Sequence, residues 1–368
     1  MAPLKRKPTR VYLDLTHLGR HVTGIERVSI EQFEKVCFDD ADVMPVRSSG
    51  IAAMIFRQQV LLPWLAMTHP KALFVFPGFP PSPLFTLFRR RAILYVHDTF
   101  LITRKQDLGL KARLYMAPSF ALAVRTFKNF FVNSEKTKAD LQVHARSDAH
   151  IRLYRPSVDN VFKLEATSRT NRDDAARPLK LVSLGTVEPR KNYAAALAIL
   201  DTLRTCHDPA AELHIVGRAG WGPVSELVKS HSGVTVHGYL AEADVRRVMA
   251  NADVYLCTSH DEGLGLPLLE AQYGGLPVVA PDKPVFREVL ATSGTFIDPA
   301  VPDQAAATIA ALISKAGWRR AASQAALDNA GRWNDLAASD LEEARRIFID
   351  MDSLASAGPL TPARAGSR

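Results

Sequence analysis

The chain has 368 residues, of which 47% are hydrophobic and 23% charged, and this length fits two domains better than one. Its three cysteines, Cys37, Cys206 and Cys257, are isolated, which argues against a disulfide framework or a zinc site and fits a reducing cytosol. The N-terminus lacks the apolar core of a signal peptide, and no uncharged apolar run is long enough to span a bilayer. We therefore expect a cytoplasmic protein.

The net charge of +8 is unevenly distributed. Residues 1–163 have 25 Lys and Arg against 13 Asp and Glu, whereas the remainder has 21 against 25. The basic half predicts an anionic partner, which is a membrane surface, a lipid-diphosphate acceptor or nucleic acid. A surface that only keeps the protein in solution is the alternative explanation.

Short apolar runs alternate with helical patterns, which predicts the α/β class with parallel sheets covered by helices. The polar segment 166–178 predicts a linker between a domain of residues 1–165 and one of residues 179–335. A C-terminal helix at 336–352 and a flexible tail at 353–368 follow. The expected strands are 11–15, 72–76, 92–96 and 129–132, then 179–184, 212–216, 234–237, 254–257 and 277–280.

Polar motifs in the first half directly follow predicted strands or open helices. Gly24 and Arg27 belong to a turn at a helix start, where Gly24 lets a phosphate or an acceptor approach the backbone. Arg27 is equally well explained as a solvated helix residue. His97 and Asp98 follow the strand 92–96, and His97 is either a functional donor or acceptor near neutral pH or a structural hydrogen-bonder. Ser134 precedes a helical pattern, and we interpret it as a helix cap.

The segments 51–67 and 83–91 allow two interpretations. The first is apolar around a single arginine, and the second joins aromatic and aliphatic side chains to three consecutive arginines. Together they form either an amphipathic patch that rests on an anionic bilayer, or a core helix followed by the entry to a strand. With the patch, the acceptor would be lipid-linked.

Cations and glycines follow the predicted strands of the second half. Thr186, Arg190 and Lys191 lie on the loop after residues 179–184, where a guanidinium and an ammonium can neutralise a leaving diphosphate. The turn with Gly217 and Arg218 ends the next strand, and Arg218 is expected to approach the diphosphate. Gly238, Tyr239 and Leu240 form the following turn, and ordinary surface loops are the alternative for both turns.

The most informative string runs from His260 to Ala271 (HDEGLGLPLLEA) and predicts a glycine-rich turn followed by a helix. Glycines let a ligand approach the main chain, and Pro267 suits the first turn of a helix. The free amides of that turn favour an anion such as a diphosphate. Glu262 on the turn and Glu270 in the helix can both accept from sugar hydroxyls.

Two Asp-x-Asp pairs were considered as metal sites. Asp40 with Asp42 is expected in an acidic loop, and Asp350 with Asp352 on a helix. Neither follows a strand next to a phosphate loop, so we interpret both as solvated surface. No metal and no cofactor are therefore expected, and the two cations at 190 and 191 take the place of a metal.

The string from Glu262 to Glu270 resembles the donor-site motif of retaining, nucleotide-sugar-dependent glycosyltransferases of family 4. These enzymes have the GT-B fold, two Rossmann-like domains with parallel sheets facing across a central cleft. The resemblance implies that Glu262 contacts the transferred sugar and that Glu270 binds the ribose hydroxyls. It implies further that the intervening backbone holds the donor, with the amides of Gly265 and Leu266 on phosphate. That donor-binding backbone comprises Gly263, Leu264, Gly265 and Leu266.

Other motifs extend the resemblance. It implies that His97 lies near the reacting carbon of the donor sugar, that Gly24 contacts the donor, and that Asp98 and Arg27 lie on the acceptor side. The turn at Gly238–Leu240 is expected beside the nucleobase. The loop with Arg190 and Lys191 resembles the family's Gly-(Arg/Thr)-x-x-Pro-x-Lys loop, with Thr186 where many members have Arg.

The resemblance implies a metal-independent, retaining hexosyltransferase that acts in bacterial surface polysaccharide assembly. The donor would be a nucleoside diphosphate sugar such as GDP-mannose, with mannose or rhamnose transferred to a saccharide or lipid-diphosphate-linked acceptor. The expected location is the cytoplasm or the inner face of the plasma membrane. The alternatives are an epimerase on the same fold and a non-catalytic polyanion binder. Nucleic acid is not an expected partner, because the Glu262/Glu270 pair would repel a phosphate backbone.

Overall fold

The computed structural model describes residues 9–18, 24–34, 41–110, 112–165, 177–218, 220 and 224–356. The chain divides into two compact units, which we call the N-terminal unit (Met1–Pro156 with Ala338–Arg368) and the C-terminal unit (Ser157–Ala337). The division falls after Pro156, earlier than residue 165, because Val158 and Leu164 pack into a core of the C-terminal unit. Most of the linker predicted at 166–178 lies outside the described residues.

The N-terminal unit contains a six-stranded parallel sheet in the order β2-β1-β3-β4-β5-β6. The four predicted strands form its four central positions. The two edge strands were not predicted, because partly exposed edges lack a continuous apolar run. The strands are β1 Thr9–Leu15, β2 Ala41–Arg47, β3 Leu73–Phe76, β4 Ala92–Val96, β5 Asn129–Val132 and β6 His150–Leu153.

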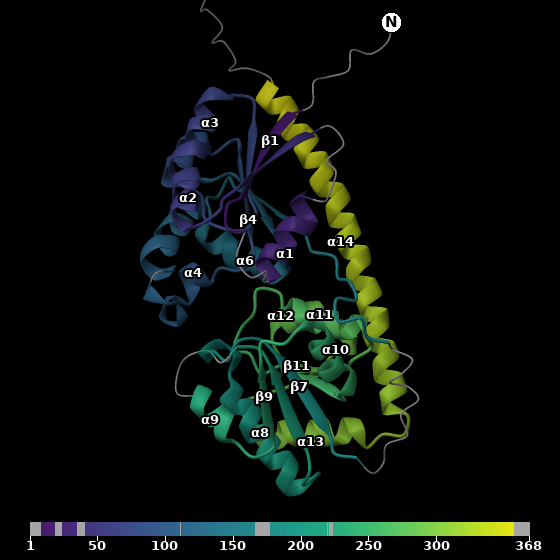
Figure 1. Ribbon diagram of the computed structural model, residues 1–368. Coiled ribbons are helices and arrows are strands. Elements are labelled where there is room, and N and C mark those ends of the chain that lie inside the picture. The colour runs from purple at the N-terminus through teal and green to yellow at the C-terminus, as the bar shows by residue number, and fades with distance from the viewer. Residues whose placement is uncertain are drawn as a thin grey trace, which may run out of the picture. The chain divides into compact units, whose positions relative to one another are not determined.

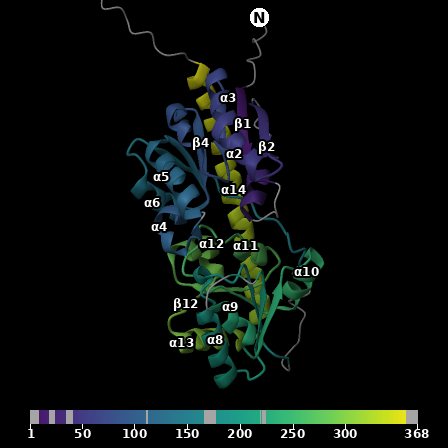
Figure 2. The same ribbon diagram turned by 60° about the vertical axis from the view of Figure 1, so that its left-hand side comes forward.

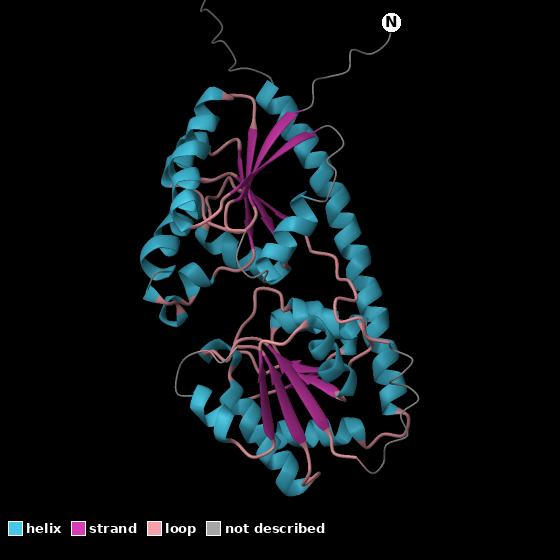
Figure 3. Ribbon diagram, viewed as in Figure 1, coloured by secondary structure: helices cyan, strands magenta, loops and turns pink. Residues whose placement is uncertain are grey.

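Helical segments cover both faces of this sheet (Figure 3). Of these, α4, α5 and α6 lie close together (Figure 2), and α6 contacts β5. The segments are α1 Gly24–Ser29, η1 Ile30–Glu34, α2 Ile51–Phe56, η2 Arg57–Leu61, α3 Leu62–Thr68, η3 Pro83–Phe88, α4 Phe100–Thr103, η4 Lys105–Asp107, η5 Ala112–Met116, α5 Ala117–Thr126 and α6 Glu135–His144.

The C-terminal unit contains a second six-stranded parallel sheet, in the order β12-β11-β10-β7-β8-β9. Five of its strands were predicted, and the exception is the three-residue edge strand β12. Apolar cores lie on both faces, as expected for a sheet with a helix layer on each side. The strands are β7 Lys180–Leu184, β8 Glu212–Val216, β9 Val234–Gly238, β10 Val254–Leu256, β11 Val278–Pro281 and β12 Thr295–Ile297.

The helices of the C-terminal unit follow its strands in alternation (Figure 1). This order places the loop after each strand at the carboxyl edge of the sheet, where ligands bind in open α/β sheets. The segments are η6 Pro189–Lys191, α8 Tyr193–Cys206, α9 Val224–Ser230, α10 Glu242–Asn251, α11 Leu266–Tyr273, α12 Pro284–Leu290, η7 Ala291–Ser293, α13 Pro302–Ile313 and α14 Trp318–Ser356.

Helix α14 belongs to both units, since the chain returns from the C-terminal to the N-terminal unit between Ala337 and Ala338. Its early part places Trp333, which is fully buried, in a core of the C-terminal unit. Its later part packs Phe348 against Phe131, with ring centroids 5.9 Å apart. The prediction of a helix at 336–352 was wrong about its start, because the preceding alanine-rich stretch continues the same helix. The helix also extends to Ser356, into the predicted tail.

Candidate functional site

The loop after β7 begins with Gly185 and carries two cations, Arg190 and Lys191. Gly185 has φ 133°, and its backbone N–H donates to Val216 O at 2.9 Å. Arg190 and Lys191 form the short helix η6, which ends at Asn192 in a left-handed conformation (φ 52°). A Cβ on Gly185 would lie 3.0 Å from Cε of Lys191. The lysine side chain therefore extends across Gly185, at a place where a larger residue would displace it.

Arg190 and Lys191 both contact the carboxylate of Glu262, whose exposed fraction is only 8%. Nη1 of Arg190 donates to Oε2 of Glu262 at 2.5 Å, and Nζ of Lys191 donates to Oε1 at 2.7 Å. Ser259 Oγ adds a third donor to Oε1 at 2.8 Å. The other side of the guanidinium, Nη2, donates to Glu188 Oε1 at 2.7 Å. We call Glu188, Arg190, Lys191 and Glu262 the ion cluster.

The ion cluster fixes the protonation states of Glu262 and Arg190. Burial alone would raise the pKa of Glu262, but the charges of Lys191 and Arg190 outweigh it and lower that pKa to about 2. Burial likewise works to lower the pKa of Arg190, and the carboxylates of Glu262 and Glu188 reverse this and raise it. Glu262 is therefore ionised throughout the neutral range and cannot serve as a general acid there.

Backbone contacts join the two loops that carry the cluster. The His260 N–H donates to Arg190 O at 2.8 Å, and Thr258 Oγ1 donates to Lys191 O at 3.1 Å. Lys283, at the start of α12, donates from Nζ to His260 O at 2.5 Å. Sequence reasoning missed Glu188, Thr258 and Ser259. Thr258 and Ser259 could have been found in the sequence, because a buried carboxylate requires several donors and a run of polar residues leads up to Glu262.

The glycine-rich turn leads into α11 as predicted. Gly265 is the N-cap in a left-handed conformation (φ 85°, ψ 46°), and Leu268 N–H donates to its carbonyl at 2.9 Å. A Cβ on Gly265 would lie 3.1 Å from Leu268 Cδ1, so the turn also packs tightly there. Glu270 is buried within α11, with 4% of its surface exposed. Gly263 and Leu264 are buried, and Leu266 is half-buried at the first helical position.

Gly185 after β7, Gly217 after β8 and Gly238 at the end of β9 meet at the carboxyl edge of the sheet. Gly217 N–H donates to Gly238 O at 3.0 Å, and a Cβ on Gly217 would lie 2.0 Å from Gly185 O and 3.1 Å from Thr186 N. These backbones approach as closely as they do because no side chains intervene. Leu240, two residues further on, packs against a core of the C-terminal unit.

The guanidinium of Arg218 lies over an aromatic ring, and its expected approach to a diphosphate stays a prediction. Its guanidinium carbon is 5.5 Å from the ring centroid of Tyr239, and 71% of Tyr239 is exposed. The backbone carbonyl of Arg218 accepts from Val187 N–H at 3.1 Å, which fixes the turn to the β7 loop. The pair offers an exposed aromatic face with a cation beside it.

His97 lies in the N-terminal unit at the end of β4. Its Nε2 is 2.6 Å from Pro77 O, and burial lowers its pKa to about 4. The ring is therefore neutral, with the proton on Nε2 toward the carbonyl and Nδ1 left as an acceptor. Asp98 Oδ1 accepts from Phe100 N–H at 3.0 Å, just before α4. Gly24 and Arg27 lie in α1, as expected.

His17 follows β1 and was missed in the sequence. It is 3% exposed, its ring centroid lies 5.2 Å from that of Phe79, and a Cβ on Gly78 would lie 2.4 Å from its Nε2. Within the described part of the chain, neither of its ring nitrogens has a hydrogen-bond partner. Burial lowers its pKa to about 4, so the ring is neutral. A histidine directly after a strand was the available signal.

The remaining sequence predictions have mixed outcomes. The cap at Ser134 is confirmed, because its Oγ accepts from Thr137 N–H at 3.1 Å at the start of α6. The acidic loop expected around Asp42 is wrong, because Asp42 belongs to β2 and pairs with Arg10 at 3.8 Å. Asp40 and the side chains of Asp350 and Asp352 lie outside the described residues. Within the described ranges, no group of three or more His, Cys, Asp or Glu is placed to hold a metal ion.

Comparison with known proteins identifies the C-terminal half. Residues 167–329 match the family model "Glycosyl transferases group 1". The chain carries a glycosyl transferases group 1 domain. The matched segment includes the ion cluster, helix α11 and the three glycines at the carboxyl edge of the sheet, Gly185, Gly217 and Gly238.

Characterised relatives extend the likeness beyond the group 1 domain. The chain is 34% identical to the serotype-specific mannosyltransferase WbdA of Escherichia coli over 137 residues, which are 36% of this chain but only 16% of that protein. It is 25% identical over 314 residues to the O-antigen chain mannosyltransferase B of Escherichia coli, with 77% of this chain and 79% of the relative covered.

Solved structures show the fold. The structure of Anabaena HepE in complex with UDP superposes on 93% of this chain and on all of that chain, with a TM-score of 0.68 and 18% sequence identity. Together with the two six-stranded parallel sheets, this likeness shows that the chain has the GT-B fold. The fold class expected from the sequence is confirmed.

Proposed function

We propose that the chain is a retaining, metal-independent glycosyltransferase that transfers a hexose from a nucleoside diphosphate sugar. The observation that carries this proposal is the ion cluster, in which Arg190 and Lys191 share the buried carboxylate of Glu262. Two cations at the carboxyl edge of a parallel sheet match the charge of a diphosphate. We propose that a bound diphosphate takes over contacts that the two cations make with carboxylates.

The surroundings of the ion cluster support a diphosphate ligand. Gly185 and Gly217 let the backbones of the sheet edge pack against each other, and Gly238 has open space where a side chain would lie, so a ligand can approach the main chain there. The Leu266 N–H lies at the first helical position of α11, where the helix dipole favours an anion. The exposed ring of Tyr239, with Arg218 beside it, supplies a surface on which a nucleobase can stack.

The chemistry of transfer follows from these charges. In the proposed reaction, the bond between the anomeric carbon and the diphosphate oxygen breaks, and the acceptor hydroxyl forms its new bond to that carbon on the same face. The departing phosphate oxygen takes the proton of the acceptor hydroxyl. Arg190 and Lys191 stabilise the charge that develops on the diphosphate, which is the role a metal has in other enzymes. Glu262, being ionised, positions the sugar and the cations rather than donating a proton.

The names of the relatives support mannose as the transferred sugar. Both Escherichia coli relatives are mannosyltransferases, and one acts on the O-antigen chain by its name. We therefore propose a mannose donor such as GDP-mannose, with rhamnose as the alternative. The acceptor is a saccharide or a lipid-diphosphate-linked saccharide of a bacterial surface polysaccharide. We assign acceptor binding to the N-terminal unit, where His17 and His97 lie beside the carboxyl ends of β1 and β4.

A calorimetric titration tests the donor site. The full chain is titrated in EDTA with GDP, UDP, ADP and dTDP, and then with their sugar conjugates. We expect one nucleotide to bind, and we expect Lys191→Ala to weaken its binding at least tenfold. Glu226→Gln, an exposed carboxylate on α9, is the control and should bind like the wild type. Binding of none of the nucleotides, together with salt-dependent binding of arbitrary DNA, would replace the proposal with a polyanion binder.

A turnover assay tests the transferase activity itself. GDP-mannose is incubated with the chain and oligomannoside acceptors, and products are separated by mass spectrometry. We expect a product heavier by one hexose, of retained anomeric configuration by NMR, and at least a hundredfold loss in Glu262→Gln. Turnover of the donor to another nucleotide sugar without any acceptor would instead indicate an epimerase.

A further inference from the structure

The helical column α2–η2–α3, residues Ile51–Thr68, has an apolar outward face. Its buried side repeats every fourth residue, at Met54, Gln58, Leu62 and Ala66, and packs toward the sheet of the N-terminal unit. Surface helices normally place polar residues on the opposite side. Here that side instead carries five large apolar residues that are 51–63% exposed: Ile51, Phe56, Val60, Trp64 and Met67.

Neighbouring segments add exposed apolar side chains beside this column. Arg91, after η3, donates from Nη2 to Ala66 O at 2.8 Å, which holds η3 to the end of α3. In η3, Leu87 is 77% exposed. Gln59 donates from Nε2 to Tyr115 Oη at 3.2 Å, which links the column to η5. We call the outward side of the column, with the exposed Leu84, Leu87, Leu114 and Tyr115, the apolar face.

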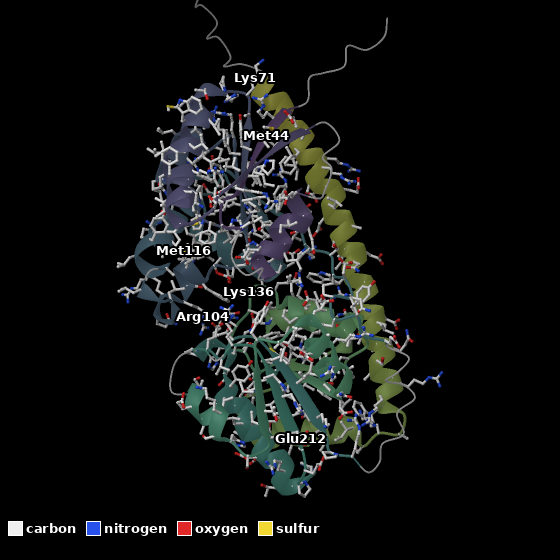
Figure 4. All side chains as sticks on the ribbon, in the orientation of Figure 1. Met44, Lys71, Arg104, Met116, Lys136 and Glu212 are labelled. Atoms are coloured by element: carbon white, nitrogen blue, oxygen red, sulfur yellow. The ribbon has the colours of Figure 1, made fainter. Side chains whose placement is uncertain are left out.

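The stretch of chain that carries the apolar face is strongly basic. From Val43 to Ser134 the chain has twelve Lys and Arg but only two carboxylates, Asp98 and Asp107. The exposed cations in this stretch include Lys71, Arg89, Arg90 and Arg113. Figure 4 labels Lys71 and Met116 near opposite ends of the column. An apolar surface on a basic stretch with exposed cations complements a bilayer, whose acyl chains lie beneath anionic headgroups.

By length and composition alone, the column is also apolar enough to cross a membrane, with a mean hydropathy of 1.2 over 18 residues. Its buried side argues against a span. Leu62 and Ala66 belong to the same core as the strands of the sheet, so crossing a bilayer would require the column to leave that core. A helix that keeps one side packed against its domain lies in the plane of the membrane–water interface. Tryptophan and tyrosine side chains, here Trp64 and Tyr115, favour the depth of the lipid headgroups.

We propose that the apolar face docks on the surface of an anionic lipid bilayer. The column lies along the interface, its outward side chains enter the headgroup region, and the surrounding Lys and Arg contact lipid phosphates. This proposal does not rest on the glycosyltransferase activity. If both hold, the acceptor site belongs to a unit that is held at the surface where lipid-linked saccharides are present.

Vesicle co-sedimentation of the full chain tests the proposal. The probes are vesicles of phosphatidylcholine alone and of phosphatidylcholine mixed with phosphatidylglycerol. We expect binding to the anionic vesicles that weakens as salt rises. The triple variant Val60→Glu, Trp64→Glu, Met67→Glu should lose at least tenfold in vesicle affinity. These side chains are exposed, so the folded state should tolerate the change, and circular dichroism checks this.

Exposed apolar residues outside the apolar face provide a control, because replacing them by glutamate adds the same kind of charge at another place. Val143 on α6 is 78% exposed and Leu227 on α9 is 51% exposed. The double variant Val143→Glu, Leu227→Glu should bind anionic vesicles like the wild type. An equal loss in this control would show that added negative charge, not the apolar face, weakens binding, and would overturn the proposal.

Tryptophan fluorescence gives a second, local readout. Trp64 is 51% exposed, whereas Trp318 and Trp333 are buried. We expect a blue shift on addition of anionic vesicles that disappears in Trp64→Phe. No wild-type binding to either vesicle would overturn the proposal. So would self-association of the wild type, abolished by the triple variant without any vesicle binding, because it would assign the face to a second copy of the chain.

Discussion

Replacing Glu262 by glutamine tests how strongly the ion cluster stabilises the C-terminal unit. The substitution keeps the side-chain shape and removes only the charge that Arg190 and Lys191 share. The pKa of Glu262 is about 2 in the folded chain, against an ordinary value of 4.5. Since one pKa unit corresponds to ~1.4 kcal/mol, the charge contributes about 3 kcal/mol to the free energy of unfolding at pH 7.

The pH dependence of this effect has a definite sign. A pKa that is lower in the folded chain than in the unfolded chain adds stability above pH 4.5, and that stability is lost as the pH falls toward 2. We expect wild type and Glu262→Gln to differ by about 3 kcal/mol at pH 7 and by about 1 kcal/mol at pH 3. The difference should therefore shrink on acidification.

Urea unfolding followed by tryptophan fluorescence measures the difference. The other three tryptophans of the sequence lie between positions 221 and 333, so the background variant Trp64→Phe removes the tryptophan signal of the N-terminal unit. Glu226→Gln is the control, because this carboxylate is 81% exposed and its pair with Lys229 should contribute less than about 0.5 kcal/mol. Equal unfolding free energies for wild type and Glu262→Gln at pH 7, or a gap independent of pH, would refute the reasoning.

Four further substitutions probe other parts of the chain. Gly217→Ala should destabilise the C-terminal unit by at least about 2 kcal/mol in urea unfolding, because its Cβ would lie 2.0 Å from a backbone carbonyl oxygen. Gly331→Ala, in open space on α14, should be neutral or stabilising. Ser134→Ala removes the cap of α6 and should cost about 1 kcal/mol in thermal unfolding. Asp340→Asn leaves the buried Arg155 without the carboxylate that it contacts at 2.9 Å and should cost about 3 kcal/mol; unchanged stability would contradict that estimate.

The interior strands and the capping and turn residues could be predicted from the sequence because their causes are local. A buried parallel strand is a continuous apolar run, and β4 and β10 follow that rule. Ser134 caps a helix through its own side chain, and Gly265 takes a conformation that suits glycine. Three of the four edge strands, β2, β6 and β12, escaped prediction because they are only partly buried and lack a continuous apolar run, whereas the edge strand β9 was predicted.

The sequence by itself determined that glycines, two cations and two glutamates follow the strands of a parallel sheet. Only the tertiary structure decided which of these groups meet. Arg190 and Glu262 are 72 residues apart, and their contact exists because β7 and β10 are neighbours in the sheet. The same pairing brings Ser259 to the carboxylate, while Arg218 lies over Tyr239. Local pattern fixes backbone conformation, but the charge state of a buried carboxylate depends on partners that only strand order can supply.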